Sequence, residues 1–131
     1  LTVDCDVIQA DGGTRTAAIT GAYVALYEAL LQLVRAGLLT DVPLNCAVAA
    51  LSVGLVEGEA LLDLSYEEDV RAQVDLNVAM TDQGGLVEIQ GTAEGAPFPK
   101  EMVGDWMDLA SQGMEPIFEV QREAIKTLVV R

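Results

Sequence analysis

Hydrophobic and polar residues alternate with a period of two in several short stretches of the chain, and this pattern predicts β-strands that bury one face. In residues 1–7 the odd positions are apolar and the even positions are polar, and a turn follows at residues 11–13. A near-continuous apolar run over residues 46–56 predicts a strand covered on both faces. Together with the flanking turns, the pattern predicts strands over residues 1–10, 46–56, 61–66, 74–81 and 86–90.

Apolar residues at spacings of three and four predict helices elsewhere in the chain. The clearest runs from Thr14 to Ala36 and ends at Gly37, because glycine commonly follows a helix C-terminus. Its first half is apolar or small on every side, so we expect it to lie sandwiched between other elements. A short helix is expected over residues 67–73. Two further helices, separated near Gly113, are expected to close the chain.

These elements predict an α+β fold in the order β-α-β-β-α-β-β-α-α, with helices packed against a mostly antiparallel sheet. The chain has 131 residues, about the length of one domain, and its sequence contains no internal repeat, linker or low-complexity segment. It begins with Leu-Thr-Val-Asp and has no initiating methionine, so we expect it to be a piece of a longer protein.

The charge balance argues against some partners. Acidic residues outnumber basic ones by 21 to 7, which gives a net charge of −14 at pH 7. A field of this sign repels phosphate backbones and anionic lipid surfaces. The uncharged stretch over residues 16–27 stops at Glu28, short of the roughly 18–20 apolar residues that a membrane span needs. We therefore expect no membrane partner.

The two cysteines offer no chemistry of their own. Cys5 and Cys46 lie in apolar stretches and form no CxxC motif, so we expect both to be reduced core residues. The sequence contains no histidine, which excludes zinc fingers and imidazole catalysis.

The turn before the long helix is a candidate anion site. A strand, two glycines and a helix N-terminus direct free backbone N–H groups and the positive end of the helix dipole at one point. The Thr14 hydroxyl can donate there, and the Arg15 guanidinium matches the oxygens of a phosphate. The alternative is an ordinary glycine turn capped by Thr14, with Arg15 exposed. A cation beside a helix N-terminus is unfavourable unless an anion offsets it, which argues against that alternative.

A second candidate is a pair of carboxylates. Asp69 ends a short acidic segment, and Asp75 follows six residues later on the polar side of a strand, with Asn77 next on the same side. A chain that turns from a helix into a strand can bring Asp69 and Asp75 together. Such a pair either shares a hard cation such as Mg²⁺ or keeps one member protonated as a general acid. The alternative is a solvated acidic face.

One anion site and one carboxylate pair, without a P-loop or a serine-centred elbow, indicate chemistry on phosphate oxygens. Three segments, residues 11–22, 66–78 and 87–95, also resemble the C-terminal half of the ribonuclease PH family. The similarity covers essentially the whole chain, and the runs GGTRT and QGTAEG are its most specific parts. Exosome core subunits and polynucleotide phosphorylase share the fold. The resemblance implies a ribonuclease PH-like fold of the ribosomal protein S5 domain 2 type, of which residues 1–131 form the C-terminal portion.

The resemblance also implies an activity, that of a phosphorolytic 3′→5′ exoribonuclease that trims the 3′ ends of tRNA precursors. Inorganic phosphate attacks the last phosphodiester and releases a nucleoside diphosphate. In that family the segment matching Gly13, Thr14 and Arg15 binds the attacking phosphate. The two aspartates that match Asp69 and Asp75 are associated with Mg²⁺ and with protonation of the leaving 3′ oxygen.

The family domain is about twice as long as this chain. Its N-terminal half carries a further phosphate-binding arginine and most of the basic surface that contacts RNA, so the acidic charge of this piece does not exclude RNA from the intact protein. Membership further implies a cytoplasmic homo-hexamer, arranged as a trimer of dimers. We expect the chain on its own to be inactive.

Two other functions stay open. Rings of the exosome type contain subunits that keep the fold and lose the chemistry, so a non-catalytic scaffold is the main alternative; retention of Thr14, Arg15, Asp69 and Asp75 together favours the enzyme. A metal-dependent hydrolase that uses the carboxylate pair is the other alternative. It would release nucleoside monophosphates, which a nucleotide assay distinguishes from diphosphates.

Overall fold

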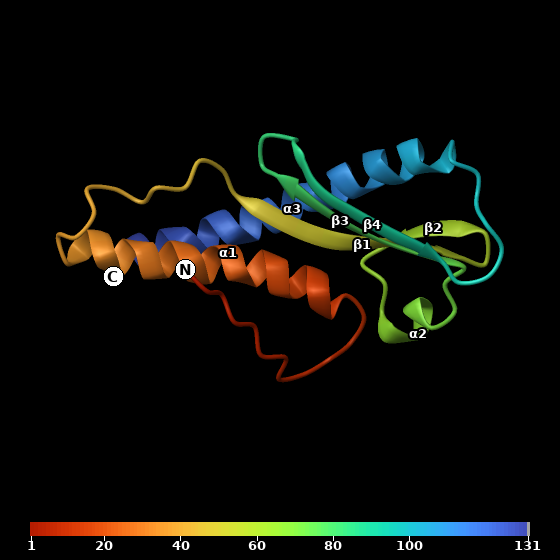
Figure 1. Ribbon diagram of the computed structural model, residues 1–131, viewed down its shortest axis with the longest axis horizontal. Coiled ribbons are helices and arrows are strands. Elements are labelled where there is room, and N and C mark those ends of the chain that lie inside the picture. The colour runs from red at the N-terminus through yellow and green to blue at the C-terminus, as the bar shows by residue number, and fades with distance from the viewer. Residues whose placement is uncertain (131) are drawn as a thin grey trace.

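A four-stranded antiparallel sheet forms the centre of the molecule, with the strands in the order β2-β1-β3-β4 (Figure 1). The computed structural model describes residues 1–130. The expected α+β class, with helices against an antiparallel sheet, is confirmed. The elements are α1 (Thr14–Arg35), β1 (Val48–Val56), β2 (Glu59–Leu62), α2 (Tyr66–Asp69), β3 (Val74–Thr81), β4 (Leu86–Ala93) and α3 (Met102–Val130).

The strands predicted over residues 46–56 and 74–81 lie close to their predicted positions, as β1 and β3. The strand predicted over residues 61–66 is wrong in its bounds: β2 spans Glu59–Leu62, because it pairs with β1 through a tight turn at Glu57 and Gly58, whose φ angles of 52° and 86° suit such a turn, and Tyr66 already belongs to α2. β4 continues to Ala93, beyond the predicted end at residue 90. Gly91 continues the strand because it pairs with Leu76 of β3, and its lack of a side chain leaves room for that residue: a Cβ there would lie 2.5 Å from Leu76 Cδ1. The short helix covers one turn, ending at Asp69, and not the two turns predicted.

One long helix, α3, covers one face of the sheet (Figure 1). Apolar residues from β1, β3 and α3 form the main core, with Trp106, Ala110, Met114 and Phe118 on the buried side of the helix. The predicted break near Gly113 is wrong, because this buried stripe continues in phase through Gly113 and Pro116. Gly113 lets the helix approach the sheet: a Cβ there would lie 2.9 Å from side-chain atoms of Leu51 and Leu62.

Helix α1 lies against the part of β1 that extends beyond β2. The Thr20 hydroxyl accepts a hydrogen bond from the Ala50 N–H at 3.0 Å and donates to the Ala50 carbonyl at 3.2 Å, so it takes the place of a neighbouring strand there. The buried Gln121 amide of α3 donates to Thr20 O and Val48 O, both at 2.9 Å. These bonds join α1, β1 and α3.

The expected sandwiching of α1 is wrong. Thr16 is the buried residue of this helix, and the side turned away from the sheet is exposed among the described residues. By length and composition α1 could also cross a membrane, so the composition argument against a span does not hold for this helix. Packing of α1 against β1 and α3 explains its apolar residues as well as a membrane would. The absence of a membrane partner stays a prediction.

The predicted strand over residues 1–10 is absent. The segment runs beside α1, where the Cys5 Sγ lies 3.9 Å from the Ala18 carbonyl, and every residue from 1 to 11 is exposed. A strand needs a neighbour for its backbone hydrogen bonds, and within residues 1–130 no strand pairs with this segment. Both cysteines are free as expected, but Cys5 is exposed and Cys46 only partly buried, so their assignment to the core is wrong.

Candidate active site

A cavity of about 150 Å³ brings the two candidate sites together. The five residues predicted to bind phosphate or to act as carboxylates all line it: Gly13, Thr14, Arg15, Asp69 and Asp75. Ser52 and Asn77 complete the lining. A larger, mainly apolar cavity of about 430 Å³ lies beside the loop over residues 95–99, and Glu94 is the ionisable residue in its lining. The smaller cavity is therefore the better candidate for chemistry.

The turn before α1 is held against the start of α2 by Asp11. Its carboxylate accepts hydrogen bonds from the N–H groups of Gly12, at 2.8 Å, and Tyr66, at 2.7 Å, and these bonds lower the pKa of Asp11, the bond from Tyr66 most strongly. Gly12 packs directly on the chain before α2, since a Cβ there would lie 1.9 Å from the Leu64 carbonyl oxygen. The anion-site turn and the segment that carries Asp69 are thus anchored to each other.

The N-terminus of α1 points free donors at the cavity. Gly13 is the N-cap residue, with φ 68° in the left-handed region, and no side chain caps this helix end. The Thr16 hydroxyl donates back to the Gly13 carbonyl at 2.8 Å. The cap by Thr14 in the alternative interpretation is therefore wrong, whereas its exposed Arg15 is present in the structure. First-turn N–H groups without a side-chain partner are the backbone donors that an anion site requires.

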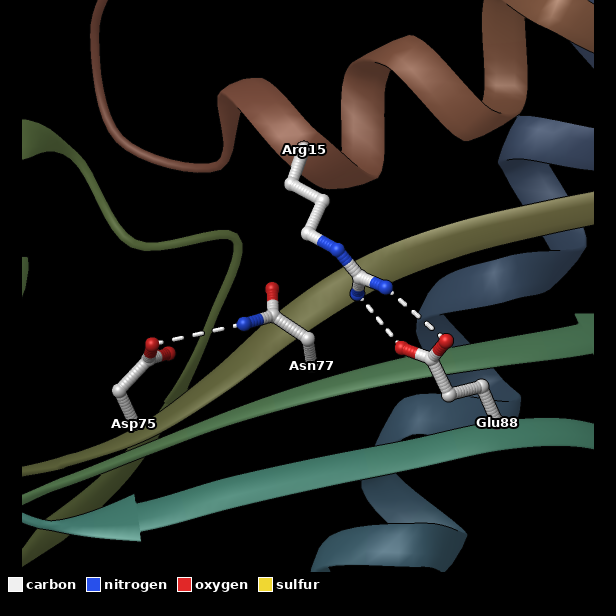
Figure 2. Close-up of polar contacts among 4 residues, drawn as sticks. All are labelled: Arg15, Asp75, Asn77 and Glu88. Atoms are coloured by element: carbon white, nitrogen blue, oxygen red, sulfur yellow. Dashed lines mark hydrogen bonds and ion pairs between the residues drawn. The ribbon is translucent and has the colours of Figure 1, made fainter.

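Arg15 forms a bidentate ion pair with Glu88 on β4 (Figure 2). Its Nη1 donates to Oε1 at 2.6 Å and its Nη2 donates to Oε2 at 2.9 Å. The hydrogen bonds lower the pKa of Glu88 and raise the pKa of Arg15. The anion that offsets the cation at this helix N-terminus is therefore a carboxylate of the chain itself. No local pattern in the sequence singles out Glu88 for this role.

Asp75 lies partly buried beside the amide of Asn77, whose Nδ2 donates to its Oδ2 at 3.4 Å (Figure 2). Burial raises the pKa of Asp75, and the nearby carboxylates of Asp69 and Glu94 raise it further, while the bond from Asn77 acts in the opposite direction. The expected approach of Asp69 and Asp75 is thus present. The roles assigned to them stay predictions.

Ser52 is buried at the floor of the cavity and was missed by the sequence analysis. Its hydroxyl accepts a hydrogen bond from the Leu64 N–H at 3.1 Å, and its own hydrogen is free to rotate toward a ligand. Ser52 faces Asn77 across the β1–β3 pair, and Gly54 faces Asp75. This register places the polar residues of two strands on the side of the sheet opposite α3, where the cavity lies.

The donor set of the cavity suits Mg²⁺. Within residues 1–130 no cluster of three or more His, Cys, Asp or Glu residues could hold a metal by itself. Mg²⁺, however, usually keeps several waters and binds through one or two carboxylates together with substrate phosphates. Asp69 and Asp75 provide two neighbouring carboxylates. Burial raises the pKa of Asp75 and the charge of Asp69 raises it further, and a bound cation would offset both effects.

The comparisons with known proteins show the family to which this fold belongs. Residues 46–113 match the family described as "3' exoribonuclease family, domain 2", and the chain belongs to this family. It is 60% identical over 126 residues to the protein named Ribonuclease PH of Nocardia farcinica, and 58% identical over 127 residues to that of Mycobacterium avium. These matches cover 95% and 96% of this chain and confirm its resemblance to the C-terminal half of that family.

The chain spans about half the length of these curated relatives, 49% in both cases. A solved structure, that of rice (Oryza sativa) Rrp46, shares the fold with a TM-score of 0.69 at 22% identity. The alignment covers 93% of this chain and 51% of that one. The ribonuclease PH-like fold is thereby confirmed.

Proposed function

We propose that this chain is the catalytic half of a phosphorolytic 3′→5′ exoribonuclease that trims the 3′ ends of tRNA precursors. The observation that carries the proposal is the shared cavity, which joins the open N-terminus of α1 to the pair Asp69 and Asp75. An anion site beside two carboxylates suits the transfer of a nucleotidyl group to phosphate. The 60% identity to a protein named Ribonuclease PH supports the same reaction.

In the proposed reaction, inorganic phosphate is the nucleophile. The first-turn N–H groups of α1, the Thr14 hydroxyl and Arg15 bind it and direct one oxygen at the phosphorus of the last phosphodiester. A new P–O bond forms, the P–O3′ bond breaks, and a nucleoside diphosphate leaves. Holding the anion beside the reacting bond removes much of the entropic cost of bringing the two together.

The two carboxyl groups act on the leaving 3′ oxygen, whose developing negative charge must be neutralised. The pair Asp69 and Asp75 supplies the proton that the leaving 3′ oxygen needs, since two close carboxyl groups resist full ionisation. Alternatively, with both carboxyl groups ionised, the pair would hold Mg²⁺, which when bound would neutralise charge on the displaced oxygen in place of a proton. Asn77 orients Asp75 through its amide hydrogen bond.

The proposal requires a second half. The curated relatives are about twice as long as this chain, and a net charge of −14 repels RNA. We infer that an N-terminal half supplies basic RNA-binding surface and completes the phosphate site, and that the intact protein is a cytoplasmic homo-hexamer built as a trimer of dimers.

The test is a nucleotide-release assay. A short RNA with a 3′ extension is incubated with inorganic phosphate and the purified chain, with and without a separately produced N-terminal half. Nucleoside diphosphates that appear only when both phosphate and the second half are present support the proposal. Monophosphates released without phosphate would indicate a metal-dependent hydrolase. No released nucleotide from the completed protein would leave the non-catalytic scaffold as the better assignment.

A further inference from the structure

We propose that Glu88 is a positioning residue that fixes the guanidinium of Arg15 so that its unused donors face the phosphate site. This inference rests on the function proposed above. The two residues lie in different elements: Arg15 is in the first turn of α1, and Glu88 is in the edge strand β4. Their bidentate contact is therefore a tertiary connection between the anion-binding turn and the edge strand of the sheet.

The pair uses only part of the hydrogen-bonding capacity of Arg15. A guanidinium has five N–H donors in one plane. Glu88 takes one from Nη1 and one from Nη2, which leaves the Nε–H and the second hydrogen of each terminal nitrogen. The Nε–H and the neighbouring Nη–H form a second fork that matches two oxygens of a phosphate. Arg15 can thus keep Glu88 and bind phosphate at the same time.

The arrangement of the side chains indicates that one edge of the Arg15 guanidinium contacts Glu88 while another edge is directed at the cavity. Figure 2 shows the guanidinium between Glu88 on one side and Asn77 with Asp75 on the other. Arg15 also lines the cavity that contains Asn77 and Asp75, whereas Glu88 is not among its lining residues. Glu88 faces the small side chain of Ala79 across the β3–β4 pair, beside an irregularity in the register. The Glu88 carboxylate can therefore extend to Arg15 without a steric conflict with the side chain of Ala79.

Stability does not explain the contact. The side chains of Arg15 and Glu88 are 49% and 41% exposed, and ion pairs at this exposure contribute little because water screens them. Bidentate geometry, in contrast, restricts the orientation of a long and otherwise free side chain. Without Glu88, ordering Arg15 would have to occur on each phosphate-binding event.

The experiment distinguishes the ordering of Arg15 by Glu88 from the effect of the negative charge of Glu88 on phosphate binding. Removing a carboxylate makes the site more positive, so electrostatics alone predicts tighter phosphate binding in Glu88→Ala. Positioning predicts weaker binding, by roughly three- to tenfold, the range expected for ordering one long side chain. The protein containing both halves is titrated with inorganic phosphate by calorimetry, and KM for phosphate, KM for RNA and kcat are measured in parallel. Most of the change is expected in KM for phosphate.

Two further variants complete the design. Glu88→Gln keeps the shape and one acceptor oxygen, so it should lie between wild type and Glu88→Ala. Glu59→Ala is the matched control, because Glu59 is an exposed glutamate on the opposite edge strand β2 and its removal changes the net charge equally. It should bind phosphate like wild type.

The outcomes distinguish the two proposals. Unchanged or tighter phosphate binding in both Glu88 variants, with wild type active, overturns the positioning role alone. A loss confined to kcat or to RNA binding overturns it as well. A wild-type protein that neither binds phosphate nor releases diphosphates overturns the proposed function, and the role of Glu88 with it.

Discussion

Replacing Gly13 by alanine tests both the geometry and the function of the α1 N-terminus. Gly13 adopts φ 68° as the N-cap of this helix. An L-residue with a Cβ pays about 1–2 kcal/mol to occupy the left-handed region, because the Cβ crowds the following carbonyl. The new Cβ would also lie 3.0 Å from Thr16 Oγ1, close enough that the hydroxyl must move. We therefore expect Gly13→Ala to lower the free energy of unfolding by about 1–2 kcal/mol.

The other end of the same helix offers a matched control. Gly37 has φ 71°, and no atom of residues 1–130 lies within 4 Å of a Cβ built on it. It completes a C-terminal capping motif in which its N–H bonds to Val34 O and the Leu38 N–H bonds to Leu33 O. Gly37→Ala therefore carries the same backbone strain, about 1–2 kcal/mol, without touching the cavity.

Two measurements on each variant decide the matter. Urea unfolding followed by circular dichroism gives the change in the free energy of unfolding from the midpoint and slope. Titration of the completed protein with inorganic phosphate gives the affinity. Both variants should lose similar stability, but only Gly13→Ala should weaken phosphate binding, because its methyl group sits beside the free N–H groups. Equal phosphate affinity in the two variants would refute the anion site at α1, and an unaltered stability in both would refute the strain argument.

Three further predictions concern the side chains of the cavity. Arg15→Ala should raise KM for phosphate while RNA affinity stays within a few-fold, which steady-state kinetics and an RNA-binding assay measure; equal loss of both would contradict the assignment. Asp75→Asn should lower kcat by roughly 10²-fold or more. Because the folded-state pKa of Asp75 is raised, its charged form opposes folding. Asp75→Asn should therefore be more stable than wild type at neutral pH in the absence of divalent metal. That difference should shrink as the pH falls through the raised pKa and vanish below the ordinary value of 3.8. Asp69→Asn should also lower kcat, and excess Mg²⁺ or Mn²⁺ should restore part of it. If neither metal restores kcat, the result would argue against a ligand role for Asp69.

Local patterns were sufficient for the parts of the site that depend on neighbouring residues. The turn from Gly12 to Arg15 is predictable because a glycine turn stands directly before a long run of apolar residues at helical spacing, so that the helix must begin there. Asp69 and Asp75 are predictable as a pair because a short helix leads directly into a strand. In both cases a few consecutive residues determine the geometry.

The residues that were missed reach the site through pairing between distant segments. Ser52 lies in an apolar run and lines the cavity only because β1 pairs with β3 in a register that sets it opposite Asn77. Glu88 meets Arg15 across 73 positions of sequence. Hydrophobic periodicity shows which residues of a strand share a face, but it does not show which distant segment lies beside that strand.

Two other errors arise from tertiary packing. Residues 1–10 alternate like a strand, but alternation describes a face and cannot show whether a partner strand is present. Gly113 and Pro116 are usual signals for the end of a helix. The apolar stripe that packs α3 on the sheet prevails over both, since helix stability in proteins comes mainly from such packing.

The β1–β3 register limits where insertions and deletions can be tolerated during evolution. Side chains alternate across a sheet, so inserting or deleting one residue within β3 would turn Asp75 and Asn77 toward α3 and turn Leu76 toward the cavity. A carboxylate in the core is costly, and the core would lose its apolar lining. Length variation among functional descendants should therefore fall in the turns that flank these strands, because an insertion inside β3 that turned Asp75 and Asn77 away from the cavity would remove them from the site.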